Sequence, residues 1–507
     1  MGNSTFFARN ALRHRLASRK FMEETTGSPN KPKRPNPWVA RALGVVTMLC
    51  VFIPALFWKG GVLEGETVSF MINYSDDRTV LQKVFNPLLN DFNMYQAREL
   101  SYFFDYLDTT FFLFLLKRFD VTLFIPLSAV VATILIILVY RRGVRRTLPG
   151  LDRVTAELLL LPFLTCFAVI STMGFFYRSA KPLLAPVLLA IMFQILHSAR
   201  SRARGQIVEK RWTLVTRQSL VAFVLLVLAA LLDRQGFFYV LLACALLLVH
   251  FLITRKLKDL LIASAAAAIV AHLYNVVIGP AIIWAINGQR PDFTFQRIPM
   301  ADLAGLPVHC LKAARVLTAN LAAMAGGYYV VGYFVVALVT AWLIWGAIVF
   351  YKESERGKRW EHYRSGQSLA IVYAAMVLAA HVVMFGLMIA RHPYVYDWVD
   401  HWYWYYPLPF LVVALVGLAV LFNAALPRLR NRHVRILRIA LVLIALSNLL
   451  HLPAYRKVMA SADWFGPVYT LSENLKASIR NDYRHPDLGG EFERFFVFHR
   501  QQRKAPK

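Results

Sequence analysis

The sequence predicts an all-α, polytopic membrane protein that crosses the bilayer with about eleven transmembrane helices. Hydrophobic residues make up 58% of its 507 positions. They occur in separate runs near the roughly twenty residues that a helix needs to cross about 30 Å of hydrocarbon. Because lipid offers no hydrogen bonds to the backbone, these runs should be helical.

The spans are placed on the apolar runs. They are residues 38–58, 121–140, 157–176, 182–197, 219–232, 237–253, 260–286, 327–350, 367–390, 407–426 and 436–452. In the seventh span, His272 and Asn275 precede Gly279-Pro280. This span should therefore kink, and its outer end should lean over a cavity. The polar residues of other spans should hydrogen-bond neighbouring helices. They are His250, His381, Asn448 and His451.

Basic clusters assign the orientation. Segments beginning at Arg141, Arg200, Lys352 and Arg428 all fall on one side of the membrane, and the positive-inside rule makes that side cytoplasmic. The N-terminus is then cytoplasmic and, with an odd number of spans, the C-terminus lies outside. Topology therefore accounts for the formal net charge of +28. The expected surroundings are a lipid bilayer, and no nucleic-acid partner is expected.

The chain has three predicted parts. Residues 1–37 form a basic cytoplasmic arm that lacks the apolar region and cleavage site of a signal peptide, so the first span should be an uncleaved anchor. Residues 38–453 form the transmembrane domain, with a first outer loop at 59–120, and residues 454–507 form an outer C-terminal cap. The four cysteines are scattered and include no CxxC pair. This pattern indicates neither a disulfide framework nor a zinc site.

The first outer loop contains an amphipathic pattern. A helix beginning near Asp91, wound at about 100° per residue, has one polar and one apolar side. The polar side holds Asp91, Tyr95, Arg98, Glu99, Tyr102, Asp105, Tyr106 and Thr109, and the apolar side holds Leu100, Phe103, Phe104, Leu107 and Phe111. The predicted interfacial helix puts its apolar side in the acyl boundary and its acids toward a water-filled cavity. The alternative is a passive interfacial helix with solvated charges.

A short motif stands at the start of this helix. Asp91-x-x-x-Tyr95 is followed by Ala97-Arg98-Glu99-Leu100. Together with the topology, it resembles the C-type membrane glycosyltransferases, which include protein O-mannosyltransferases and the aminoarabinose transferase of lipid A. Their pattern is Asp-Glu-x-x-Tyr, then Ala-Arg-Glu-Met; here Phe92 replaces the second acid and the Tyr-to-Arg spacing is shorter. The resemblance implies transfer of a sugar from a polyprenyl-phosphate donor to a glycan, lipid or protein acceptor, on the periplasmic face of a bacterial inner membrane.

Such a transfer needs a carboxylate to take the proton of the acceptor hydroxyl. Asp91 is the predicted base. Glu99 and Asp105 are further candidate acids, and Asp108 lies at the flank of the polar side. The adjacent acids at 76–77 compete for the role, although such a pair is typical of a solvated turn. No cofactor is predicted with certainty, and a divalent metal of unknown ligands stays open.

The released phosphate needs fixed cations. The candidates are Arg98, Arg234, Arg391 and His392. The candidate substrate-binding residues are Tyr95, Tyr102, Asp233, His401, Trp402 and Tyr405. An aromatic belt at the headgroup level is the alternative explanation for the last three. Asp233 ends a predicted helix, where its charge opposes the macrodipole and needs a partner.

Three functions remain open at this point. A lipid-linked sugar transferase needs an outer carboxylate, which the first-loop helix supplies. A multi-span transporter or flippase should contain inverted repeats and charged residues near the middle of the bilayer, and neither is evident. An O-antigen ligase or polymerase-like enzyme should have its long outer loop late in the chain, whereas here the long loop comes first. The glycosyltransferase is the preferred hypothesis.

Overall fold

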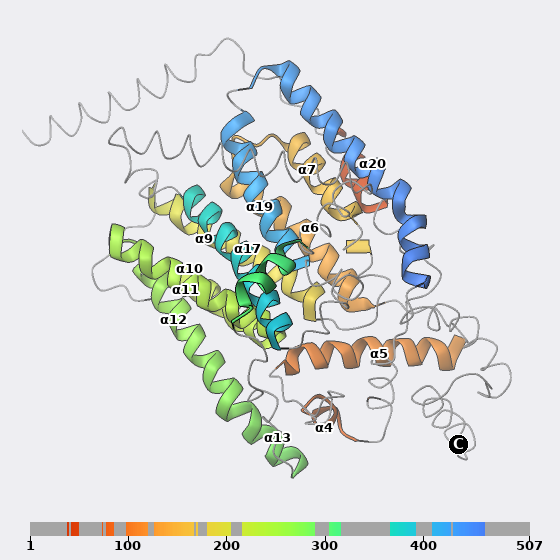
Figure 1. Cartoon of the computed structure of the whole chain (residues 1–507), viewed down its shortest axis with the longest axis vertical. Helices are drawn as coiled ribbons and strands as arrows, with labels where there is room; N and C mark the ends of the chain where they lie inside the picture. The colour runs from red at the N-terminus through yellow and green to blue at the C-terminus, as the bar shows by residue number, and fades with distance from the viewer. Residues whose placement is uncertain are drawn as a thin grey trace, which may run out of the picture. The chain divides into compact units, whose positions relative to one another are not determined.

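The computed structural model describes residues 38–39, 42–49, 74, 78–85, 98–119, 126–166, 169–170, 180–203, 215–288, 304–315, 366–391, 408–426 and 429–461. Every regular element in these ranges is helical. The chain forms two compact units, Met1–Ala42 and Leu43–Lys507, and the elements below belong to the second. They are α4 (Val80–Val84), α5 (Glu99–Phe119), α6 (Leu127–Thr147), α7 (Arg153–Thr165), α9 (Ala180–Ala203), α10 (Arg217–Leu232), α11 (Arg234–Thr254), α12 (Lys258–Leu273), the π-helix η1 (Tyr274–Ile278), α13 (Gly279–Asn287), α17 (Gly366–Arg391), α19 (Leu408–Ala425) and α20 (Asn431–Ser461) (Figure 1).

Within the described residues, five helical stretches are long and apolar enough to cross a membrane. They are Leu127–Thr147, Pro182–Arg202, Gln235–Leu252, Lys258–Asn287 and Asn431–Pro453. The protein is therefore an integral, multi-pass membrane protein. The helices α7, α10, α17 and α19 also coincide with predicted spans. The span at 38–58 is described only in part, and the span at 327–350 lies outside the described residues, so the count of about eleven stays a prediction.

Several helix boundaries differ from the predicted ones. Helix α6 covers Leu127–Thr147 rather than 121–140, because arginine is a good helix former and the helix continues through the basic cluster after the apolar run. Helix α7 begins earlier, since the Asp152 side chain accepts a hydrogen bond from the Thr155 amide at 3.0 Å and caps its N-terminus. Helix α20 runs on to Ser461, past the predicted start of the C-terminal cap at 454.

The arginine-rich helix ends meet at one end of the bundle, which we call the basic end. Arg200, near the end of α9, donates to the carbonyl of Thr147 at the end of α6. Arg202, also on α9, pairs with Asp259 at the start of α12, with a nitrogen–oxygen distance of 2.5 Å. These contacts show that α6 and α9 both end there, as the charge pattern predicts for one side of the membrane.

Helix α5 lies at the opposite end, which we call the α5 end. Its Leu100 and Phe104 pack on a cluster of Ala132 from α6, Leu183 from α9 and Leu232 from α10. Figure 1 shows α5 running across this end of the bundle. The predicted apolar side of α5 is thus divided between a part that packs on the bundle and a part that is exposed. Leu100 and Phe104 contact the protein, while Phe103, Leu107 and Phe114 form an exposed stripe.

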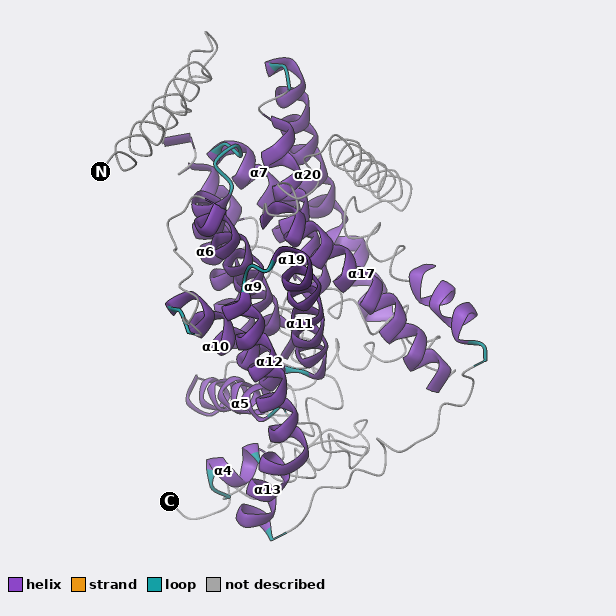
Figure 2. Ribbon diagram, turned by 90° about the vertical axis from the view of Figure 1, so that its left-hand side faces the viewer, coloured by secondary structure: helices purple, strands orange, loops and turns teal. Residues whose placement is uncertain are grey.

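The seventh predicted span is irregular at the expected place. The π-helix η1 lies directly before Gly279 and Pro280. A proline cannot donate a backbone hydrogen bond and clashes with the preceding turn of an α-helix, and a π turn is one way to accommodate it. Beyond it, α13 reaches α4. The Asn287 side-chain amide donates to the carbonyl of Phe85 at 2.6 Å, and Figure 2 shows the two helices side by side.

Two polar residues of the last predicted span, Asn448 and His451, lie on α20. The Asn448 amide of α20 donates to the Pro162 carbonyl of α7 at 3.0 Å, so it links neighbouring helices as predicted. His451 lies 3.0 Å from the Ser447 carbonyl of its own helix. A carbonyl one turn earlier is within easy reach of a helical side chain.

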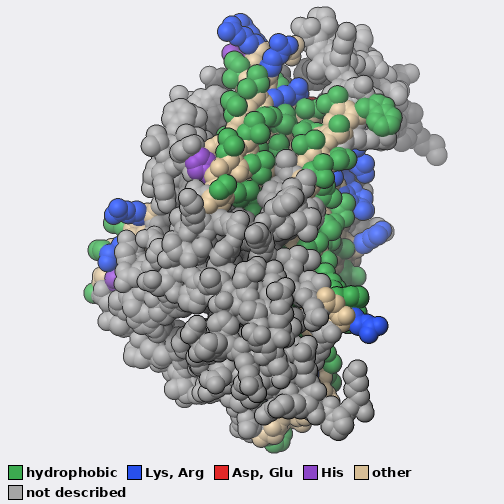
Figure 3. Space-filling model, turned by 90° about the vertical axis from the view of Figure 1, so that its right-hand side faces the viewer, with side chains coloured by type: hydrophobic (Ala, Val, Ile, Leu, Met, Phe, Trp, Pro, Cys, Tyr) green, Lys and Arg blue, Asp and Glu red, His purple; other side chains and the backbone are tan. Residues whose placement is uncertain are grey.

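Helix α20 exposes a continuous apolar stripe. Its members are Ile436, Ile439, Leu443, Leu446 and Leu450. On the face drawn in Figure 3, hydrophobic side chains predominate among the described residues, with Lys and Arg gathered mainly toward its margins. In a soluble protein such a surface would favour aggregation. In a bilayer it is the expected lipid-facing surface.

Candidate functional site at the α5 end

Arg98 is held between the first loop and the helix bundle. It directly precedes α5 and is 4% exposed. One guanidinium nitrogen lies 3.7 Å from an Asp233 carboxylate oxygen. Its Nε donates to the Tyr102 hydroxyl at 3.3 Å, and the guanidinium lies 5.7 Å from the centre of that ring. A buried cation is thus fixed by residues that are far apart in the sequence.

Asp233 is the single residue between α10 and α11. Its carboxylate accepts a hydrogen bond from the Gln235 amide at 2.8 Å, which caps the N-terminus of α11. The expected cost of an acid at the end of α10 is therefore offset by the start of α11 and by Arg98. The junction depends on Gly236, because a Cβ there would overlap the Ala229 carbonyl.

Glu99 is bound by the seventh span. It is the first residue of α5 and is buried. The hydroxyl of Tyr274 in η1 donates to its Oε2 at 3.0 Å. Tyr274 was not among the predicted site residues. The signal that could have identified it was its position beside Asn275, just before the Gly-Pro interruption of an otherwise apolar span.

The two acids further along α5 lie on its protein-facing side, and both are buried. Asp108 accepts a hydrogen bond from the Ser128 amide at 2.9 Å and another from the Ser128 hydroxyl. Ser128 belongs to the first turn of α6, whose N-cap residue Pro126 offers no side-chain cap. Asp108 therefore caps α6 from α5. Burial raises its pKa to about 7, the nearby charge of Asp105 adds to the rise, and the bonds from Ser128 oppose it.

A small aromatic group supports the start of α5. The Tyr74 hydroxyl donates to the Tyr102 carbonyl at 3.1 Å, and its ring packs edge-to-face on Tyr106 at 5.8 Å. The ammonium of Lys83, from α4, lies 5.8 Å from the centre of the Tyr106 ring. Tyr102, predicted to bind substrate, is buried here and orients Arg98.

The structure thus brings together Arg98, Glu99, Tyr102 and Asp233, and places Asp105 on the same buried side of α5. The other predicted site residues lie outside the described residues. They are Asp91, Tyr95, His392, His401, Trp402 and Tyr405, together with the acid pair at 76–77. Arg234 begins α11 and Arg391 ends α17, but their side chains are not described. No group of three or more potential metal ligands occurs within the described ranges.

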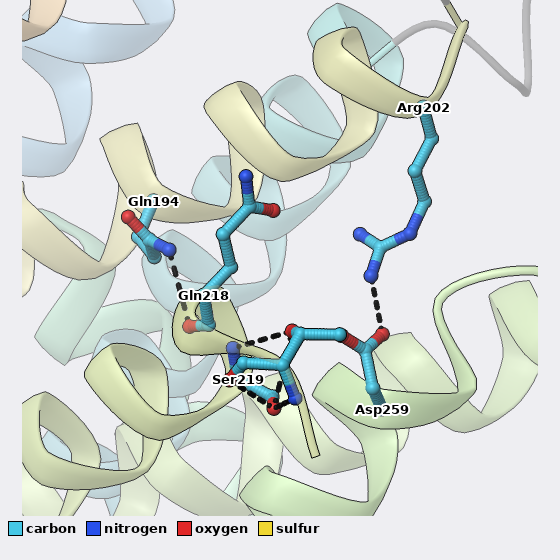
Figure 4. Close-up of polar contacts among 6 residues, drawn as sticks. Gln194, Arg202, Gln218, Ser219 and Asp259 are labelled. Carbon is cyan, nitrogen blue, oxygen red and sulfur yellow. Dashed lines mark hydrogen bonds and ion pairs between the residues drawn. The ribbon is translucent and has the colours of Figure 1, made fainter. Parts of the chain in front are cut away.

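A second polar cluster lies at the basic end. Asp259 binds Arg202 through one carboxylate oxygen, and accepts a hydrogen bond from the Thr216 hydroxyl at 2.6 Å through the other. Gln194 of α9 donates to the Gln218 carbonyl of α10 at 3.1 Å. Figure 4 shows these side chains joining α9, α10 and α12. The ion pair and the hydrogen bonds link these three helices.

The fold and the site together define a multi-pass helical membrane protein with a buried cluster of ionisable residues at one end. No protein-family model, no characterised protein and no solved structure matches the chain. The geometry at the α5 end is consequently the basis for assigning a function.

Proposed function

We propose that the protein is an integral-membrane glycosyltransferase. It moves a hexose or pentose from a polyprenyl-phosphate donor to an acceptor hydroxyl on a glycan, lipid or protein. The site is the α5 end of the bundle, which faces the periplasm in a bacterial inner membrane. The observation that carries this proposal is the buried group of Arg98, Glu99 and Asp233, contributed by the motif-bearing first loop and by the α10–α11 junction.

The position of this group suits a donor whose reactive part is a headgroup. A polyprenyl phosphate keeps its chain in the bilayer and its phosphate at the surface, the level that the end of a helix bundle occupies. The ion pairs of the described residues also lie toward the two ends of the bundle. A transporter instead places its charged site near the middle of the membrane, so this arrangement favours the transferase.

In the proposed reaction, the acceptor oxygen bonds to the anomeric carbon of the sugar as the bond from that carbon to the phosphate oxygen breaks. Asp91 takes the proton of the acceptor hydroxyl. The polyprenyl phosphate leaves with the electron pair, and its negative charge is met by Arg98, with Arg234, Arg391 and His392 as further cations. The guanidinium of Arg98, which lies 3.7 Å from the Asp233 carboxylate, has a planar donor geometry that matches a phosphate.

The test measures sugar transfer by the purified protein in lipid nanodiscs. Polyprenyl phosphates carrying labelled hexoses or pentoses are the donors, and membranes that lack the protein supply the acceptor. Asp91→Asn should lower the rate by about two to four orders of magnitude, because the base is lost while the side-chain shape is kept.

The matched control is Asp152→Asn, the same change at the α7 N-cap near the basic end, where asparagine also caps a helix. It should retain wild-type transfer. If Asp91→Asn, Asp77→Asn and Asp105→Asn all transferred sugar normally, or if the wild type used none of the donors, the proposed function would be wrong.

A further inference from the structure

We infer that Tyr274 is a positioning residue of this site and acts on the reaction through Glu99. The inference rests on the proposed function. Its starting observation is the hydrogen bond from the Tyr274 hydroxyl to Glu99 at 3.0 Å, which joins residues 175 positions apart. A hydrogen bond to a carboxylate is charge-assisted and directional, so Tyr274 sets where one of the acids beside Arg98 lies.

The backbone aims Tyr274 at this acid. Tyr274 is the first residue of the π turn, whose amide of Gly279 donates to the Tyr274 carbonyl five residues earlier. A π turn adds one residue to a helical turn and rotates the side chains around it relative to a regular helix. The Tyr274 ring also packs against Ile283 in the next helical segment. The π turn in the seventh span thus helps to place the Tyr274 hydroxyl beside Glu99.

The segment beyond the turn is anchored to the first loop. Ile283 is buried and contacts Phe85, which follows α4, and Asn287 donates to the Phe85 carbonyl. The seventh span therefore contacts the loop at α5 through Tyr274 and near α4 through α13. These contacts limit the rotation of η1 and keep the phenol in reach of Glu99.

The arrangement gives the two acids near Arg98 different partners. Asp233 pairs with Arg98, whereas Glu99 accepts from Tyr274. Glu99 adjoins Arg98 in the sequence, so a carboxylate released from Tyr274 would compete with the donor phosphate for the guanidinium. Tyr274 thereby fixes the carboxylate next to the cation that the proposed function assigns to the donor phosphate.

The test is a double-mutant cycle on sugar transfer with Tyr274→Phe, Glu99→Gln and the double variant. Tyr274→Phe keeps the ring and should lower kcat/KM for the donor by about tenfold to a hundredfold, as expected for a lost hydrogen bond to a charged group. In the Glu99→Gln background the same change should cost little more. Tyr140→Phe is the matched control, since that hydroxyl donates to the Ala156 carbonyl elsewhere in the bundle; it should leave kcat/KM unchanged.

The outcomes separate this inference from the proposed function. A loss in Tyr274→Phe that is equally large in the Glu99→Gln background would overturn the inference, because Tyr274 would then not act through Glu99. A wild type that transfers no sugar would overturn the proposed function. The thermal unfolding temperatures of the wild type, the two single variants and the double variant would then test whether Tyr274 and Glu99 interact. If the decreases in unfolding temperature of the single variants simply add in the double variant, the two residues are not coupled.

Discussion

At the residue scale, Asp108 shows how one buried carboxyl joins two helices. It lies on α5, yet it caps the N-terminus of α6 through Ser128. The helical pattern placed Asp108 at the flank of the polar side and suggested a second catalytic acid. Its hydrogen bonds from Ser128 give it a capping role. Its partner is twenty residues away across an undescribed connection, so no local pattern could identify it.

The raised pKa of Asp108 makes stability depend on pH. Its pKa rises from 3.8 to about 7 on folding, so the folded state holds a proton that the unfolded state has released. We expect stability to be highest below about pH 4 with respect to this group and to fall as the pH rises to about 7. Asp108→Asn should remove this contribution to the change of the unfolding free energy with pH. Unfolding of the wild type and of Asp108→Asn in detergent at pH 5 and 7.5 would measure this contribution. The same change in stability between the two pH values for both proteins would contradict the prediction.

At the scale of elements, α5 and the seventh span carry the site. The sequence pattern predicted an amphipathic helix in the first loop, and α5 confirms a helix there from Glu99 onward. The pattern did not predict that the buried side would include Leu100 and Phe104. Helical winding sorts residues by polarity, whereas packing also depends on where α6, α9 and α10 end. The pattern did not predict the hydrogen bond of Tyr274 with Glu99 either, because that bond depends on how the seventh span packs against α5.

The exposed stripe of α5 predicts direct contact with lipid. Photoreactive phenylalanine at Phe103 or Phe114 should crosslink to phospholipid, because these side chains face outward. The same group at Phe112, which is fully buried, should crosslink to protein. Mass spectrometry of the irradiated protein in nanodiscs distinguishes the products. Lipid adducts at Phe112 but not at Phe103 would show that α5 has the opposite orientation.

At the scale of the whole molecule, the bundle has two chemically different ends. Arg98, Glu99, Asp233 and several tyrosines gather at the α5 end, while arginines from α6 and α9 gather at the basic end. The positive-inside rule predicts that the basic end faces the cytoplasm, and the proposed function places the site at the other end. Ion pairs such as Arg202 with Asp259 additionally fix helices at the basic end.

Topology can be tested by labelling single introduced cysteines in intact cells with an impermeant maleimide, after the native cysteines are replaced. Thr79→Cys, just before α4 at the α5 end, should react, because Thr79 is exposed and lies off the lipid-facing stripe of α5. Arg142→Cys, also exposed but near the basic end, should react only after the cells are opened. Glu491→Cys should react from outside if the number of spans is odd. Protection of Glu491→Cys until lysis would contradict the odd number, and reversed labelling of the first two would invert the topology.

The sequence by itself determined the membrane class, the positions of most described helices, the basic side and the helix of the first loop. These features follow from local composition and period, since apolar length decides what can enter a bilayer and charge decides its orientation. Only the tertiary structure decided that Arg98 meets Asp233, that Glu99 meets Tyr274 and that Asp108 caps α6. Each of these contacts joins separate parts of the chain. The angles and ends at which helices pack are set by many side chains together, so no single segment contains that information.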